Sequence, residues 1–345
     1  MTSSGRHGAI GGRVRRLVPA PIRRAAARAV ASSRAAYVER QLAVLARDER
    51  PIVAGPWLGE VGFELLYWIP FLRWFAERYE IQAERLIAVS RGGSAAAWYG
   101  TFAARSHDAL SFMSPDDFRR RNQDRIGRFW EQKQIAVTPL DEEIVSFVRR
   151  AEGRAVSVLH PSMMYRLFAP YWWGHQPLDW VRRYARFAPL RPPSLELNLP
   201  ASYTAVKFYF NDCFRDTAGN RAFVEKTIRR LAEQGPVISL STGITVDDHV
   251  PCEPDIAAMQ RIRHLLTPQS NLVVQSAIVA GARRFVGTYG GFAYLSPLCG
   301  VPAVSYYTEP GGYSTRHLDL VRDVLTSSGH PELLDVVEVE RETDR

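Results

Sequence analysis

The sequence predicts an α/β protein made of two domains, each built on a parallel sheet. Short apolar runs alternate with glycine loops and helical segments along most of the chain, as in repeated strand–loop–helix units. The length of 345 residues exceeds the usual size of one hydrophobic core. Four prolines between 189 and 200 interrupt the pattern, which then restarts. We therefore expect an arm (1–50), a first domain (51–195), a second domain (196–325) and a C-terminal tail (326–345).

Composition limits the class of protein. The chain is 46% hydrophobic and 23% charged, as in globular proteins, and no run of 18 apolar residues could form a membrane span. The three cysteines, Cys213, Cys252 and Cys299, are far apart and odd in number. They fit neither a disulfide framework nor a zinc site, so we expect a reducing, cytoplasmic environment.

The net charge of +8 comes from one end of the chain. Residues 1–38 contain eight arginines and no acidic residue, so the rest of the chain is close to neutral. Nucleic-acid binding needs a basic face on the folded body. We therefore expect no nucleic-acid partner.

The arm is expected to be disordered over 1–20 and helical from Pro21 to about Asp48. At 100° per residue, its arginines cluster on one side of this helix and its apolar residues on the other. Such a helix is either a solvated basic arm or a peripheral contact of residues 1–48 with an anionic membrane surface. The basic side, an arc of about 140°, consists of Arg23, Arg24, Arg28 and Arg34. The apolar side consists of Ile22, Ala26, Ala29, Val30 and Tyr37.

The first domain opens with a strand at 52–54 and a glycine loop at 55–62, followed by a helix with apolar residues at helical spacing. A second strand, 85–90, runs into Arg91-Gly92-Gly93 and a helix from about Ser94. The remaining elements are a charged helix within 115–135, a strand at 155–159, and an irregular aromatic segment at 160–177.

The second domain repeats the same units. Its strands are expected at 205–210, 237–240, 284–288 and 303–307, and its helices at 221–234, 271–281 and 292–298. Gly300 occupies the position just past a helix end. A last helix around 318–325 could pack back across the first domain, and the acidic end beyond it is expected to be mobile.

The segment from Arg284 to Tyr307 is a strand, a glycine turn, a short helix and a strand. Thr288, Tyr289, Gly290 and Gly291 form the turn. Glycines let backbone approach a ligand closely, and a helix start offers unpaired N–H groups to an anion. The segment is thus either a phosphate cradle or an ordinary strand–helix turn that needs glycine.

The segment FVGTYGGFAYLSPLCGVPAVSYY resembles the donor-binding region of the GT-B glycosyltransferases, and its pattern is similar to that of bacterial heptosyltransferase-like proteins. The resemblance covers the architecture from about 51 to 325 and is sharp over some twenty residues. It implies two Rossmann-like domains facing across a cleft. The second would bind a nucleotide-diphosphate sugar as co-substrate, and the first a hydroxyl of a glycan or lipid-linked acceptor. No Asp-x-Asp motif occurs, which suits transfer without a metal or other cofactor.

Transfer to a hydroxyl needs a general base near the attacking oxygen. In related GT-B enzymes the base often lies in the region of the first glycine loop, where Glu60 and Glu64 are the candidates, with His160 as an alternative. The two glutamates could instead stabilise the start of the helix electrostatically.

Lys207 lies within the first strand of the second domain and Arg215 in the loop after it, where a positive charge would stabilise a departing diphosphate. Lys207 could also sit on an edge strand or extend outward. On the first domain, Arg91, Gly92 and Tyr165 are expected to contact the acceptor, although aromatic residues there could equally pack in the core. Donor ribose or base contacts are open for Asn211, Asp212 and the loop Asp247-Asp248-His249, which lacks metal-ligand spacing.

Two rival functions belong to other classes. A nucleotide-dependent oxidoreductase would share the α/β architecture, but neither half has G-x-G-x-x-G with an acid about twenty residues later. A noncatalytic glycan- or nucleotide-binding protein would keep the fold and lack the catalytic electrostatics.

Overall fold

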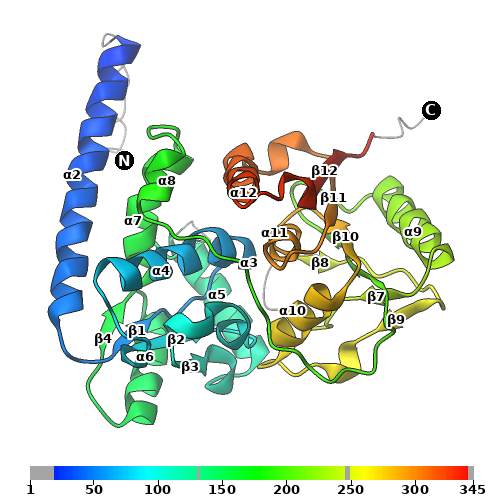
Figure 1. Ribbon diagram of the computed structural model, residues 1–345, viewed down its shortest axis with the longest axis horizontal. Helices are drawn as coiled ribbons and strands as arrows, with labels where there is room; N and C mark the ends of the chain where they lie inside the picture. The colour runs from blue at the N-terminus through cyan, green and yellow to red at the C-terminus, as the bar shows by residue number, and fades with distance from the viewer. Residues whose placement is uncertain (1–18, 130–132, 245–248, 341–345) are drawn as a thin grey trace, which may run out of the picture.

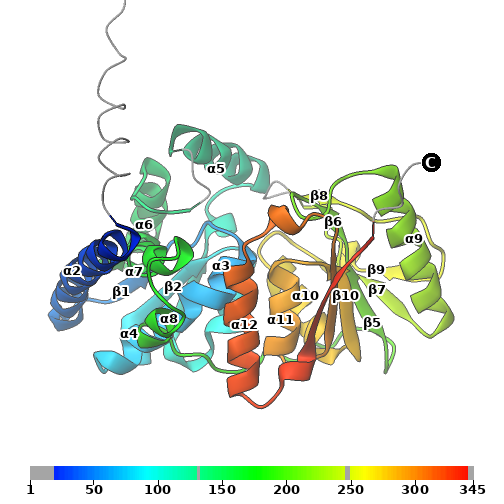
Figure 2. The ribbon, with the colours of Figure 1, turned by 90° about the horizontal axis from the view of Figure 1, so that it is seen from above.

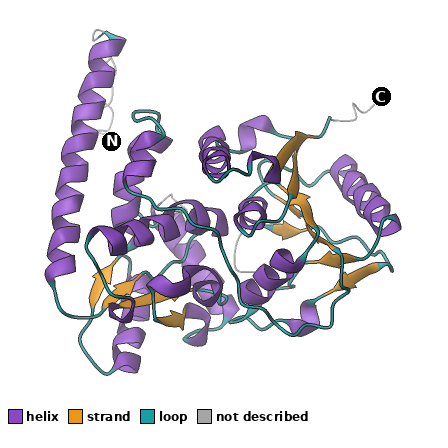
Figure 3. Ribbon diagram, in the orientation of Figure 1, coloured by secondary structure: helices purple, strands orange, loops and turns teal. Residues whose placement is uncertain are grey.

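The computed structural model describes residues 19–129, 133–244 and 249–340 (Figure 1). Its strands form two separate parallel sheets, each flanked by helices (Figure 3). This confirms the predicted α/β class with parallel sheets. Residues 1–18, on which most of the expected disorder falls, lie outside the described residues.

The first sheet has four parallel strands in the order β3-β2-β1-β4. Ile52 of β1 lies level with Leu86 of β2 on one side and Ser157 of β4 on the other. All three residues of β1 and all five of β2 are buried, because helices cover both faces of the sheet. The strands are β1 (Ile52–Ala54), β2 (Leu86–Ser90), β3 (Arg105–Asp108) and β4 (Ser157–Leu159).

The helix after the first glycine loop runs from Val61 to Arg78, with a π-helical stretch at Glu64–Trp68. A second π-helical stretch, Ala95–Tyr99, follows β2. The helices of this half are α2 (Ala20–Arg47), α3 (Val61–Phe63), α4 (Ile69–Arg78), α5 (Pro115–Phe129), α6 (Pro139–Glu152), α7 (Pro161–Trp172) and α8 (Asp179–Arg183).

The segment 160–177, expected to be irregular, contains the helix α7. His160 caps its start by accepting a hydrogen bond from the backbone N–H of Ser162, and Pro161 occupies the first helical position, which tolerates proline. The prolines and aromatics that suggested a loop are compatible with this helix, because its aromatic residues pack inward.

The second sheet has six parallel strands in the order β12-β11-β10-β5-β7-β9, and a two-stranded antiparallel pair, β6-β8, adjoins it. Helices α10, α11 and α12 lie on the side of the sheet that faces the first domain, and α9 lies on the other side (Figures 1 and 2). The strands are β5 (Thr204–Lys207), β6 (Tyr209–Phe210), β7 (Val237–Ser239), β8 (Val250–Pro251), β9 (Met259–Arg261), β10 (Arg284–Thr288), β11 (Ala303–Tyr307) and β12 (Leu334–Glu338), and the helices α9 (Ala218–Glu233), α10 (Asn271–Gly281), α11 (Gly291–Leu298) and α12 (Thr315–Ser327).

The chain beyond residue 325 differs from the expected tail. β12 pairs in parallel with β11, with Ala303 level with Leu334, and so forms an edge of the second sheet. Its apolar residues were too few to predict a strand among acidic neighbours. Residues 341–345 lie outside the described part. The helix expected around 318–325 is α12, and it does pack across the first domain: Tyr171 donates to the carbonyl of Arg316 at 2.7 Å.

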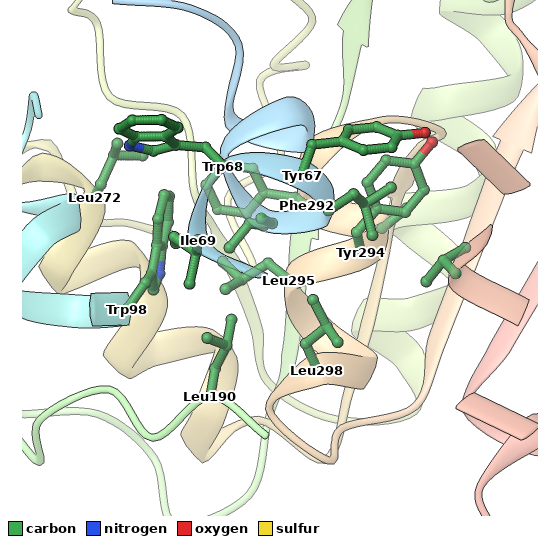
Figure 4. Packing of buried hydrophobic residues seen from close by; sticks show 14 of the residues in the cluster. Tyr67, Trp68, Ile69, Trp98, Leu190, Leu272, Phe292, Tyr294, Leu295 and Leu298 are labelled. Carbon is green, nitrogen blue, oxygen red and sulfur yellow. The ribbon is translucent and has the colours of Figure 1, made fainter. Parts of the chain in front are cut away.

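One hydrophobic core runs through both halves (Figure 4). The indole N–H of Trp98 donates to the Ser276 hydroxyl across the seam at 2.8 Å, and the N–H of Leu190 donates to the carbonyl of Leu298 at 2.7 Å. In Figure 4, Trp68 of the first half lies beside Leu272 of the second, and Ile69 lies beside Leu295. Among the described residues, no helix is long and apolar enough to cross a membrane.

Candidate active site between the two domains

A cavity of about 270 Å³ lies at the seam, near the lower end of the size range of small-molecule sites. Both halves of the chain line it. The first contributes residues from the loop and helix at 60–67, and the second from β5, α10 and the turn before α11. Among the predicted site residues, the cavity brings together Glu60, Arg91, Lys207, Tyr289, Gly290 and Gly291.

Two glycines allow the halves to meet at this cavity. A Cβ on Gly291 would lie 2.9 Å from the backbone nitrogen of Gly62, and one on Gly62 would lie 3.4 Å from the Cα of Gly291. A Cβ on Gly290 would overlap the hydroxyl of Tyr209. Gly62 and Gly291 therefore let the backbones at the starts of α3 and α11 touch, which any larger residue at Gly291 would prevent.

The loop that carries Glu60 is held at several points. The side chain of Gln134 accepts from the N–H of Leu58 at 2.9 Å and donates to the carbonyl of Pro56 at 2.8 Å. Arg91 donates to the carbonyl of Gly59 at 3.0 Å. These bonds leave the Glu60 side chain exposed at the mouth of the cavity. The Glu60 carboxylate is therefore accessible from the cavity.

His160 does not line the cavity. Its Nε2 lies 3.4 Å from Oδ1 of Asp141, which also accepts from Gln134 at 3.0 Å. Burial opposes ionisation of Asp141, but hydrogen bonds from His160 and Thr138 lower the pKa of its carboxyl. The structure thus places His160 in a buried network behind the Glu60 loop.

Glu64 is also outside the cavity lining and is 1% exposed. One of its oxygens accepts from the hydroxyls of Ser90 at 2.6 Å, Ser94 at 2.9 Å and Tyr99 at 2.9 Å. Burial raises the pKa of Glu64 to about 7, although the three hydroxyls and nearby Arg91 oppose the rise. Glu64 therefore organises the end of β2 and the loop that carries Arg91.

Lys207 is partly buried on the second-domain wall. Its Nζ donates to Oε1 of Gln275 at 2.5 Å and lies 3.9 Å from the centre of the Phe292 ring, in the first turn of α11. The ammonium group therefore sits beside the turn that forms the predicted cradle. Tyr289 lines the same wall, where burial raises its pKa and its hydroxyl accepts from Tyr294 at 2.8 Å.

The other predicted contact residues lie elsewhere. Thr288 is fully buried and exchanges hydrogen bonds with the backbone of Tyr209, so it ties β10 to β6. Gly92, at φ +68°, abuts the start of α10, and its carbonyl accepts from the N–H of Leu272 at 2.7 Å. Tyr165 stacks on Trp57 in the core. Arg215 is exposed on the loop before α9 and does not line the cavity.

His317 lines the cavity and was not predicted. It lies on α12, and its Nδ1 is 2.6 Å from the hydroxyl of Tyr67, which comes from the first domain. Burial and nearby Lys133 lower the pKa of His317 to about 4, so the imidazole is neutral at physiological pH. No local pattern could indicate this pair, because 250 residues separate its members.

Of the loop candidates, Asn211 and His249 line the cavity, whereas Asp212 is exposed and does not line it. The His249 ring lies 4.3 Å from that of Tyr209. Asp247 and Asp248 lie outside the described residues. Within residues 19–129, 133–244 and 249–340, no group of three or more His, Cys, Asp or Glu side chains has the arrangement of a metal site.

No protein-family model and no curated protein sequence matches the chain. Solved structures that resemble it include glycosyltransferases and a putative UDP-N-acetylglucosamine 2-epimerase from Listeria monocytogenes, which has a TM-score of 0.31 at 8% identity over 83% and 91% of the two chains. The iron-containing dodecameric glycosyltransferase TibC from enterotoxigenic E. coli H10407 has a TM-score of 0.39 at 11% identity, over 75% of this chain and 58% of that one. The chain thus spans less than two thirds of TibC. E. coli ADP-heptose LPS heptosyltransferase II has a TM-score of 0.40 at 11% identity, over 85% and 91% of the two chains. SnogD from Streptomyces nogalater has a TM-score of 0.37 at 13% identity, over 84% and 86%. At these scores the likenesses identify no substrate and no residue role.

Proposed function

We propose that the protein is a glycosyltransferase that moves a sugar from a nucleotide-diphosphate sugar to a hydroxyl of a glycan or lipid-linked acceptor, without a metal. One observation carries the proposal. The exposed carboxylate of Glu60 on the first domain and the ammonium of Lys207 on the second line one cavity, beside the start of α11. A base and an anion site on opposite walls are what direct transfer from a diphosphate requires.

In this proposal the diphosphate lies at the start of α11, beside Lys207. The acceptor oxygen attacks the anomeric carbon and forms the new C–O bond, while its proton passes to Glu60. The bond from that carbon to the diphosphate oxygen breaks with inversion. The negative charge that develops on the diphosphate is stabilised by Lys207 and by the backbone N–H groups at the helix start.

The neighbouring residues have supporting roles in the proposal. Arg91 contributes a buried positive charge on the acceptor side of the cavity, where its Nε has no hydrogen-bond partner among the described residues. An anionic acceptor would gain from that charge. His160, Asp141 and Gln134 keep the Glu60 loop in place, and His249 and Asn211 lie where a nucleoside could contact them.

The donor half can be tested by thermal shift with nucleotides. Binding to the native state alone at 100 times the dissociation constant adds about 2.7 kcal/mol of stability. We expect nucleoside diphosphates and nucleotide sugars to raise the melting temperature. Stabilisation by dinucleotides instead would favour the oxidoreductase, and stabilisation by none of these ligands would favour a noncatalytic protein.

The role of Lys207 can be tested with Lys207→Met, which keeps the length of the side chain and removes the charge. A hydrogen bond to a charged group contributes roughly 1.5–3 kcal/mol, so nucleoside diphosphate affinity should fall about 10- to 150-fold. Isothermal titration measures this loss. Arg215→Met is the matched control, because Arg215 lies outside the cavity, and it should bind like the unmodified protein.

Glu60→Gln should bind the nucleotide normally and lose turnover by about 10²- to 10⁴-fold, because a positioned base contributes on that order. Turnover is measured with a panel of nucleotide sugars and acceptors, and binding by titration. Normal turnover in the glutamine variant would remove Glu60 from the mechanism, and loss of nucleotide binding would assign it to donor recognition.

A further inference from the structure

Helix α2 has an inner face that packs on the body of the protein. Ala31, Ala35, Val38 and Leu42 are all at most 4% exposed and lie on one side of the helix. They pack with the first domain, where α2 lies along α7 (Figures 1 and 2). The inner face therefore fixes the helix on the outer edge of the first domain.

The outer face of α2 carries a second apolar stripe that the described part of the protein leaves uncovered. Ile22, Val30, Tyr37 and Val44 are 51–69% exposed and fall within an arc of about 80° on the other side of the helix. These are four of the nine large hydrophobic residues exposed in the described part of the chain. Their concentration on one helix face indicates a contact surface.

The positive charge of α2 favours an anionic partner. The helix contains six arginines and one acidic residue, Glu39. Glu39 is already engaged, since its carboxylate accepts from the hydroxyl of Tyr184 at 2.6 Å and pairs with Arg183. A second copy of the helix would bring like charges together, whereas an anionic lipid surface would neutralise them.

The first turns of α2 extend beyond the body of the protein (Figure 1). Ile22, Arg24, Arg28 and Val30 are exposed there, and no other described element covers them. At 100° per residue, Arg34 and Arg40 lie at the two edges of the stripe, and both are exposed. An apolar stripe flanked by arginines is the composition of a helix that lies in the lipid headgroup region. We infer that the outer face of α2 docks the protein on an anionic membrane surface, with the inner face holding the body to the helix. This inference does not depend on the proposed sugar transfer.

The test is sedimentation of the full chain with vesicles. We expect binding to vesicles of phosphatidylcholine with about one third phosphatidylglycerol, weak binding to phosphatidylcholine alone, and release at high salt. Each arginine near an anionic surface changes partitioning about fivefold, so Arg34→Gln with Arg40→Gln, at the edges of the stripe, should weaken binding about 25-fold. Val30→Ser with Tyr37→Ser should weaken it further, and all variants should keep the melting temperature of the parent.

Two matched controls isolate the surface. Arg229→Gln with Arg230→Gln on α9 removes the same charge from the opposite side of the molecule, and Val137→Ser removes an apolar side chain that is 53% exposed elsewhere. Both should bind vesicles like the parent. Equal binding by the α2 variants and the parent would overturn the inference. So would a dimer of the parent in sedimentation velocity that Val30→Ser with Tyr37→Ser converts to a monomer, because the stripe would then be a seam between copies.

Discussion

Glu60 and Glu64 show how much one turn of helix changes a carboxyl group. Both flank the start of the same helix, four residues apart. Glu60 is exposed at the cavity mouth, whereas Glu64 is buried and takes three hydroxyl hydrogen bonds. Sequence spacing predicts that both glutamates neighbour the same loop, but not which of them reaches solvent. That depends on Ser90 at the end of β2 and on Ser94 and Tyr99 after it.

Burial of Glu64 predicts a dependence of stability on pH. Its pKa rises from a reference of 4.5 to about 7 on folding. The folded state therefore holds this proton more tightly, so the free energy of unfolding is largest below pH 4.5 and falls as pH rises to about 7, by about 3 kcal/mol. Glu64→Gln cannot ionise and should lack this fall.

Urea denaturation of the parent and of Glu64→Gln, each at pH 5 and pH 8, measures this fall in the free energy of unfolding. His317 contributes with the opposite sign, since its depressed pKa costs stability as pH falls from 6.5 towards 4. Both proteins contain His317, so their difference isolates Glu64. The same change between the two pH values in both proteins would show that Glu64 does not titrate in this way.

At the scale of elements, the contact between α3 and α11 depends on the absence of side chains. Gly291→Val would place its Cβ 2.9 Å from both the Gly62 nitrogen and the nearer methyl carbon of Val61. Overpacking of this kind costs roughly 1–3 kcal/mol. We expect a lower melting temperature and at least tenfold weaker binding of a nucleoside diphosphate, because the seam must open.

Gly219→Ala provides the comparison. Gly219 lies in the first turn of α9, and a Cβ there would meet nothing within 4 Å. Alanine should leave binding unchanged and stabilise the protein by about 0.5–1 kcal/mol. Gly291→Val behaving like this control would mean that the seam tolerates a side chain.

The elements were predictable from sequence where the pattern is local. The unit from β10 to β11 appears as expected, with α11 ending at Leu298 and Gly300 at φ +79°. The site was only partly predictable. The positions of Glu60, Lys207 and the glycine pair near the cavity could be inferred because each lies at or after the end of a strand, whereas His317 reaches the cavity through packing of α12 against the first domain. Thr288 and Tyr165 have the right location in sequence, but their side chains are used inside the fold.

At the scale of the whole molecule, one core spans both sheets. Trp98 and Ser276, and Leu190 and Leu298, join the halves away from the cavity. Neither half can unfold without exposing apolar surface of the other. We therefore expect a single cooperative transition, with the calorimetric enthalpy equal to the van't Hoff enthalpy. Differential scanning calorimetry tests this, and two resolved transitions would mean that the halves are energetically separate.

The contact between Gly62 and Gly291 has a consequence for what the cavity can bind. Each lies at the start of a helix, so two positive ends of helix dipoles adjoin at one point. The two positive ends repel each other across the seam unless a negative charge lies beside both of them. An anion bound there acts as a counter-ion for both helices, so its binding free energy and the free energy of holding the halves together are linked, and each increases the other.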